Sequence, residues 1–300
     1  MKTTRTELLL LTLLACLVPP RVVAATWFLN AARGNDSNPC KQETAACKTI
    51  GHAIALAASN DSINIAAGTY NENLSIPVSL KLNGTNAVTT IIDGGANDHT
   101  VSILNTALVV SLNRLTIRNG AGLSGAGIIN WGKLTLSSST VSGNSLFSES
   151  SVVGAGVYNL GTLTVSNSTI SGNGTTANYS YGGGIYSSGT LIINNSTVSG
   201  NSLSGYLGGG GAAIFIGAGT ANISSSTIAG NTSSSSGSGI YMENANVLVK
   251  NTIVAGNTTG ENCYGTATGV VFAKPWMTFL LKRKEEIGAP LGQSRNSNVI

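Results

Sequence analysis

Side chains that could transfer protons gather in one short stretch of the sequence. Asp93, Asp98 and His99 place two carboxyl groups and an imidazole close together along the chain. Two positioned carboxylates are the minimum for most glycoside hydrolysis, and an imidazole can act as a general base near neutral pH. The stretch also suits a turn, because Asp93 can bond its own backbone and the two glycines after it tolerate positive φ. We keep these three residues as fallback catalytic candidates.

The centre of the chain is poor in such groups. From Val101 to Asn257 the carboxylates are Glu149 and Glu243, which stand far apart, and there is no histidine. The basic residues in this stretch are Arg114, Arg118, Lys133 and Lys250. Hydroxyl and amide side chains dominate, and these form hydrogen bonds without readily transferring protons near neutral pH. We expect binding rather than catalysis, with no cofactor and no metal site.

Three cysteines follow the N-terminal leader. Cys40 and Cys47 bracket a short polar loop, which indicates a disulfide in an exported chain. A metal site is the weaker interpretation, because no histidine or second cysteine pair stands beside them in the sequence. Cys263 is left over, and we expect it to be a free thiol or to have lost a partner.

An internal repeat organises the chain from Gly125 to Asn257. Its clearest copy runs from Gly154 to Asn173, and successive copies close on Gly-Asn at steps of 29, 28, 30 and 26 residues. Within a copy, as in Thr162–Val165, apolar residues take every second position, which is the periodicity of a strand. A four-stranded propeller blade needs roughly 40 residues, so this period favours one coil of a parallel β-helix.

Stacked coils would align equivalent residues into columns. One expected inward column is Leu136, Val165, Ile193, Ile223 and Val249, and a second is Val141, Ile170, Val198, Ile228 and Val254. The closing asparagines are expected to stack as an amide ladder, namely Asn144, Asn173, Asn201, Asn231 and Asn257.

Aromatic residues form a further column on the outside. Tyr158, Tyr186, Phe215 and Tyr241 occupy the same place in successive copies, directly after an inward Val or Ile. Two interpretations stay open, a ladder that only stabilises the coils and a strip that binds glycans. The longest segments between copies are expected to be loops that leave from one corner and offer a partner surface, and they carry Phe147, Tyr179, Tyr181 and Tyr206.

The N-terminus has the pattern of a secretory signal. Met1–Ala24 combines a positive start, an apolar run from Leu8 to Val18 and a small-residue cleavage site. The run is too short to span a membrane. Leu13–Cys16 also resembles a bacterial lipobox, so a lipid anchor on Cys16 is the less favoured alternative to plain secretion.

Helical spacing occurs once, from Lys48 to Ala58. The end of a solenoid exposes a cross-section of its core, so we expect this segment to form a short capping helix with His52 on its rim. We therefore expect four parts in the chain. Residues 1–24 form the signal peptide, 25–98 the cap and first irregular coils, 99–262 the regular coils, and 263–300 an atypical tail.

Several ordered motifs resemble a known family. These are Trp27–Ala31, Gly34–Ser37, Cys47–Ile50, Ala67–Leu74 and Ile92–Gly95, followed by the Gly-Ile-Tyr and Ser-Gly-Asn coils. Together they resemble secreted bacterial right-handed parallel β-helix repeat proteins of the pectin-lyase-like superfamily, near adhesin-like and polymorphic outer-membrane-protein-like members. The resemblance implies an all-β, right-handed parallel β-helix. It is compatible with an adhesin-like surface or secreted protein, and alternatively with a polysaccharide lyase or glycoside hydrolase.

Net charge gives no indication of nucleic acid binding. The chain carries +4, of which the leader contributes +2 and the residues after Cys263 contribute +3, so residues 25–263 carry −1. A near-neutral body has no electrostatic footprint for phosphate. No apolar stretch is long enough to span a bilayer. We expect partners among extracellular glycans or surface proteins of a host or neighbouring cell.

Overall fold

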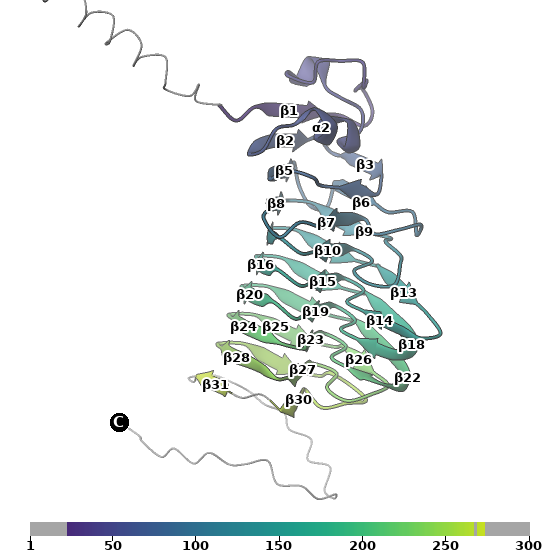
Figure 1. The fold of residues 1–300 in the computed structure, drawn as a ribbon, viewed down its shortest axis with the longest axis vertical. Coiled ribbons are helices and arrows are strands. Elements are labelled where there is room, and N and C mark those ends of the chain that lie inside the picture. Colours follow the sequence, from purple (N-terminus) through teal and green to yellow (C-terminus); the bar gives the residue numbers. More distant parts are fainter. Residues whose placement is uncertain (1–22, 267–268, 274–300) are drawn as a thin grey trace, which may run out of the picture.

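The computed structural model describes residues 23–266 and 269–273, with side chains up to residue 265. Nearly all of the expected signal peptide, including Cys16, and most of the expected tail lie outside the described residues. The described chain forms one column of stacked coils, with the N-terminal end uppermost in Figure 1. The expected fold class, a right-handed parallel β-helix with a short helix at its start, is confirmed.

Three long parallel sheets make up the walls of the column. Sheet A consists of β1 (Thr26–Leu29), β2 (Asp61–Ile65), β5 (Leu80–Gly84), β8 (Val109–Asn113), β11 (Lys133–Ser137), β16 (Thr162–Ser166), β20 (Thr190–Asn194), β24 (Gly219–Ser224), β28 (Ala245–Lys250) and β31 (Gly269–Ala273). Sheet B consists of β3 (Gly68–Asn71), β6 (Thr90–Asp93), β9 (Thr116–Arg118), β12 (Thr140–Ser142), β17 (Thr169–Ser171), β21 (Thr197–Ser199), β25 (Thr227–Ala229) and β29 (Ile253–Ala255). Sheet C consists of β4 (Leu74–Ser75), β7 (Val101–Ile103), β10 (Ile128–Asn130), β15 (Val157–Asn159), β19 (Ile185–Ser187), β23 (Ile214–Ile216), β27 (Ile240–Glu243) and β30 (Cys263–Thr266).

A fourth sheet projects from the corner between sheets B and C (Figure 1). Sheet D consists of β13 (Ser145–Phe147), β14 (Ser151–Val153), β18 (Gly174–Tyr181), β22 (Ser202–Gly210) and β26 (Thr232–Ser233). The sequence prediction of loops is wrong here, because these segments pair in parallel from one coil to the next. A small core of their own supports them, made of Ala126, Leu146, Val152, Ala155 and Ala177.

Both predicted inward columns are confirmed. Val165 pairs in register with Leu136 in one neighbouring coil and with Ile193 in the other, and all three side chains are buried. The column through Val141 and Ile170 behaves in the same way. Like residues therefore stack on like along one narrow core.

The predicted amide ladder is also confirmed. Asn144 donates from its side-chain nitrogen to the oxygen of Asn173 at 2.8 Å, and Asn173 donates in turn to Asn201 at 2.9 Å. The pattern continues through Asn231 to Asn257. The glycine before each closing asparagine adopts a left-handed φ of 62° to 66°. At Gly172 a Cβ atom would meet nothing within 4 Å, so backbone conformation and not space requires glycine there.

The N-terminal end is closed as expected by a helix. Helix α2 (Ile50–Leu56) buries Ile50, Ala53 and Ile54 against the first coils, and the short helix η2 (Glu43–Ala45) lies in the loop before it. At the other end, β30 and β31 extend sheets C and A beyond the last Gly-Asn copy. None of the helices in the described residues is long and apolar enough to cross a membrane.

Candidate functional site

Asp93 is held in an internal hydrogen-bond network. Its Oδ2 accepts from Arg118 Nε and from Asn119 Nδ2, each at 2.8 Å, and its Oδ1 accepts from the backbone N–H of Gly95 at 3.1 Å. Burial works to raise the pKa of Asp93, but the hydrogen bonds from Asn119, Arg118 and Gly95 outweigh it and leave that pKa lowered. A carboxylate so occupied fixes the turn after β6 and is poorly placed to exchange protons with a ligand.

Asp98 and His99 form a small pair nearby on the surface. His99 Nε2 lies 3.7 Å from Asp98 Oδ1, and its Nδ1 lies 3.2 Å from the carbonyl oxygen of Gly125. Asn73 fixes this turn by donating to the carbonyl oxygens of Gly94, Asp98 and His99. The fold thus brings Asp98 and His99 together, whereas the Asp93 carboxylate is bonded to Arg118.

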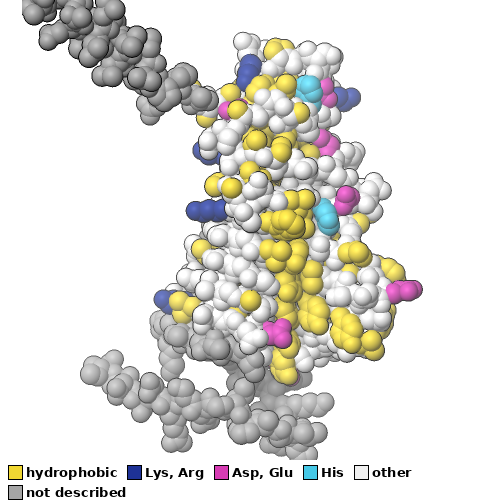
Figure 2. Space-filling view, in the orientation of Figure 1, with side chains coloured by type: hydrophobic (Ala, Val, Ile, Leu, Met, Phe, Trp, Pro, Cys, Tyr) yellow, Lys and Arg dark blue, Asp and Glu magenta, His cyan; other side chains and the backbone are white. Residues whose placement is uncertain are grey.

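The outward aromatic column is a continuous ladder on sheet C. Tyr186, Phe215 and Tyr241 stack nearly parallel, with ring centroids 5.1 Å and 4.9 Å apart. Tyr158 and Tyr264 extend the ladder at its two ends with tilted rings. Figure 2 shows an apolar band along the long axis of the molecule, over the face where Figure 1 places the strands of sheet C. The central rings cover one another's faces, and Phe215 is only 2% exposed. The centre of the ladder therefore stabilises the stacked coils.

Tyr181 connects the ladder to sheet D. Its ring and that of Phe215 form a T-shaped pair with a centroid distance of 5.0 Å. Burial first, and then the nearby Glu243 carboxylate, raise the pKa of Tyr181 and of Tyr241. Both hydroxyls therefore stay protonated near neutral pH and remain able to donate hydrogen bonds.

The outer rim of sheet D presents large apolar side chains to solvent. Phe147, Tyr179, Tyr206 and Leu207 are 69%, 44%, 70% and 66% exposed, and we call this set the aromatic edge. Figure 2 shows apolar side chains gathered on this projecting part of the molecule. The ring of Tyr179 lies beside Gly208 of the next strand, where a Cβ would come within 3.6 Å of it. Exposed aromatic residues gathered on one rim are typical of interaction surfaces.

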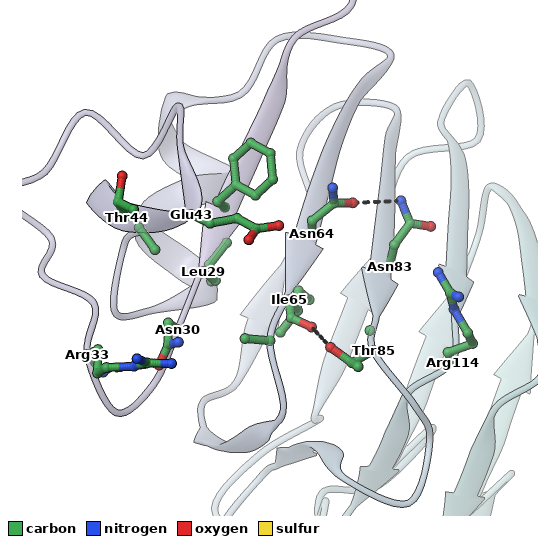
Figure 3. A pocket seen from close by; sticks show the side chains of 14 residues that line it. Leu29, Asn30, Arg33, Glu43, Thr44, Asn64, Ile65, Asn83, Thr85 and Arg114 are labelled. Atoms are coloured by element: carbon green, nitrogen blue, oxygen red, sulfur yellow. Dashed lines mark hydrogen bonds between the residues drawn. The ribbon is translucent and has the colours of Figure 1, made fainter.

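A groove of about 840 Å³, lined by both polar and apolar residues, lies on sheet A near the N-terminal end. Figure 3 shows the Asn64–Asn83 hydrogen bond between the labelled Arg33 and Arg114. Among the described residues neither arginine has a carboxylate within 4.0 Å, and the groove's own carboxylate is Glu43. The groove therefore offers amide and guanidinium donors to a polar ligand, without a carboxylate pair or a histidine.

Sequence reasoning missed this groove. Asn64 and Asn83 do occupy equivalent places in β2 and β5, and a comparison of those two strands could have found them. Arg33 comes from a loop far away in the sequence, so only the fold brings it to the same surface.

The predicted disulfide is confirmed, with the Cα atoms of Cys40 and Cys47 5.0 Å apart. One premise behind it is wrong, because the fold places His52 beside the two sulfur atoms although the sequence separates them. Cys263 is a free thiol packed against the core, and burial raises its pKa to about 11. Such a thiol is almost entirely protonated near neutral pH and is a weak nucleophile.

Comparisons with known proteins add little beyond this geometry. No protein-family model matches the chain, and no curated protein sequence matches it either. Four chains among solved structures match, including a pectin methylesterase from carrot with 14% identity, 85% of each chain covered and a TM-score of 0.38. That likeness says nothing about the activity of the present chain.

Proposed function

We propose that this chain is an exported, non-catalytic β-helix protein that binds extracellular carbohydrate through the aromatic edge of sheet D. The observation that carries the proposal is the exposure of Phe147, Tyr179, Tyr206 and Leu207 on one rim. Apolar side chains of this size are normally buried, and together on one surface they favour a partner.

The chemistry of the rim suits a neutral sugar. Aromatic rings offer apolar faces, and tyrosine adds a hydroxyl that can donate and accept hydrogen bonds. The polar neighbours in these strands and turns are mainly serine, threonine and asparagine, with Glu149 as the one nearby acid in the sequence. Parallel pairing of β13, β18 and β22 holds the rim in a fixed shape, which reduces the entropy lost on binding.

Export is part of the proposal. A disulfide in the first coils suits an oxidising compartment, and the leader pattern of Met1–Ala24 suits secretion. Export would place the aromatic edge among extracellular or cell-surface glycans.

A glycan array probed with the purified chain tests the proposal. We expect binding to a defined set of neutral glycans, and a loss of at least about tenfold in affinity for Tyr179→Ala and Tyr206→Ala, since one stacked ring contributes on the order of 1.4 kcal/mol. Trp131→Ala is the matched control, because Trp131 is 40% exposed but lies outside sheet D.

Other outcomes point elsewhere. Binding of acidic glycans that is lost in Arg33→Ala or Arg114→Ala would move the site to the groove on sheet A. Binding that survives in both tyrosine variants, or no glycan binding at all, would remove the proposal. Capture of one defined surface protein through the same tyrosines would replace the carbohydrate with a protein partner.

A further inference from the structure

Three metal-ligating side chains meet beneath the N-terminal cap. The sulfur atoms of Cys40 and Cys47 and a ring nitrogen of His52 all lie within 4.8 Å of one another. Both cysteines are fully buried and His52 is half-buried. In the oxidised chain the disulfide occupies both sulfurs, so the same three side chains have a second use only when it is reduced.

The backbone around the cysteines is held without the sulfur–sulfur bond. Phe28 of β1 donates to the carbonyl oxygen of Cys40 at 2.9 Å and accepts from the N–H of Cys47 at 2.8 Å. Asn30 donates to the carbonyl oxygen of Cys47 at 2.9 Å. Strand β1 therefore fixes both cysteines, and we expect the two side chains to stay close together after reduction.

Helix α2 holds His52 just as firmly. Thr49 caps the helix by accepting from the N–H of His52 at 3.3 Å. The two carboxylate oxygens of Glu72 accept from the N–H groups of Ile50 and Gly51 at 2.8 Å and 2.7 Å. These bonds come from outside the Cys40–Cys47 loop, so we expect the backbone at His52 to keep its place whatever the redox state of the cysteines.

A carboxylate, Asp36, lies near the histidine. Asp36 accepts bonds from the N–H groups of Lys48 and Thr49 and from the Thr49 hydroxyl, and it interacts electrostatically with His52. Carboxylates near ligating histidines are common in zinc sites.

We propose that the reduced chain binds one Zn²⁺ through Cys40, Cys47 and His52, with water as the fourth ligand. Tetrahedral zinc with bonds of about 2.3 Å to sulfur needs the two sulfurs about 3.8 Å apart. Rotation of the side chains can reach this separation, because the Cα atoms stand 5.0 Å apart. Two thiolates cancel the charge of Zn²⁺, which lowers the cost of holding the ion in a buried place.

The change from disulfide to zinc site takes two steps. A thiol reductant supplies two electrons and two protons to the disulfide and becomes a disulfide itself, which leaves two protein thiols. Zinc then displaces both thiol protons to the solvent as it binds. The loop is thus closed by a disulfide in oxidising surroundings and by zinc in reducing ones.

Metal titration of the full chain tests this inference. The background carries Cys16→Ser and Cys263→Ser, so that two cysteines remain, and it is refolded with a phosphine reductant, which becomes a phosphine oxide with oxygen from water. Thiol counting verifies reduction. We expect one tightly bound Zn²⁺ per reduced chain, none per oxidised chain, and a thiolate-to-metal charge-transfer band when Co²⁺ replaces Zn²⁺.

Single substitutions distinguish the zinc ligands from residues that do not bind the metal. His52→Ala should weaken zinc binding by at least roughly tenfold, and Asp36→Asn by a smaller factor. His99→Ala is the matched control, because His99 is the other histidine of the chain and should leave binding unchanged. X-ray absorption on the zinc-loaded background gives a readout that needs no His52 variant, and it should show two sulfur neighbours and one imidazole nitrogen.

Two results would overturn the inference. One is a fully reduced chain that takes up no stoichiometric zinc. The other is zinc held with two sulfurs but without imidazole nitrogen, which would leave His52 as a neighbour and not a ligand.

Discussion

The closing asparagine of each coil stabilises its own corner and both neighbouring coils. Asn173 accepts bonds from the backbone N–H and the side-chain amide of Asn144, and its own amide donates to Asn201 and to the carbonyl oxygen of Val141. All of these groups are buried and away from water. Removal of one amide therefore leaves several partners unsatisfied at once.

Asn173→Ala should lower the free energy of unfolding by about 2–4 kcal/mol, since each orphaned buried group costs about 1–3 kcal/mol and partial relaxation recovers some of it. Denaturant unfolding followed by circular dichroism measures the change. Asn222→Ala is the matched control, because Asn222 is exposed on β24 and should change stability by under about 0.5 kcal/mol. Equal losses in the two variants would contradict a structural role for the ladder.

Asp93 makes stability depend on pH. The net lowering of its pKa below the ordinary value of 3.8 means that its contribution is present above pH 3.8 and is lost as the pH falls through the lowered value. Asp93→Asn should therefore destabilise the chain at pH 7 and reduce the acid dependence of unfolding below about pH 4. Thermal unfolding at pH 7 and pH 3 checks this, and an unchanged acid dependence would count against the Asp93–Arg118 interaction.

At the scale of the elements, the alternation of apolar and polar residues determines which side of each short strand faces the core. In β16 the side chains of Leu163 and Val165 point into the core while Thr164 points outward, and the neighbouring strands β11 and β20 repeat the pattern in register. A shift of one residue would turn every apolar side chain of a strand to the solvent. The repeat of 26 to 30 residues thus fixes the register as well as the fold class.

Val165→Asp should destabilise the chain by about 4 kcal/mol or more, because it places an unpaired charge in a fully buried column. Thr164→Asp, one position along the same strand, should cost far less because its side chain faces outward. Comparison of soluble yield and denaturant midpoint for the two variants measures the contrast. Similar behaviour of both would mean that the register is wrong.

The strands of sheet D could not be predicted from the alternation of apolar and polar residues. Its segments vary in length and contain glycine runs such as Gly208–Gly211, which read as loops. Their strand character comes from pairing between successive coils, as Thr175 with Leu203 and Tyr181 with Gly210. Local propensity cannot report that pairing, because the partner strand lies a whole coil away.

For the molecule as a whole, the fold could be predicted because each coil repeats the same pattern of inward apolar residues and closing asparagine. The inward columns through Val165 and Val141, the amide ladder through Asn173 and the stack through Tyr186 all follow from one period. The division of the chain into a leader, first coils, regular coils and a tail remains a prediction.

The candidate sites were less predictable, because they depend on contacts between residues that do not belong to the repeat. His52 comes close to Cys40 and Cys47 only because α2 folds back over the first coil. Arg33 and Arg114 line one groove only because β1, β2 and β5 lie side by side in sheet A. The burial of Phe215 likewise could not be read from its place in the column, because Tyr181 of sheet D covers it.

The measurement that tests the account most directly is product release from polysaccharides. The purified chain is incubated with the glycans that it binds, and with pectate, polygalacturonate and alginate, with and without calcium. The account predicts binding without cleavage, so products should appear no faster than in buffer alone. Product release that rises with protein concentration and is lost in Asp98→Asn or His99→Gln would contradict it and identify an enzyme.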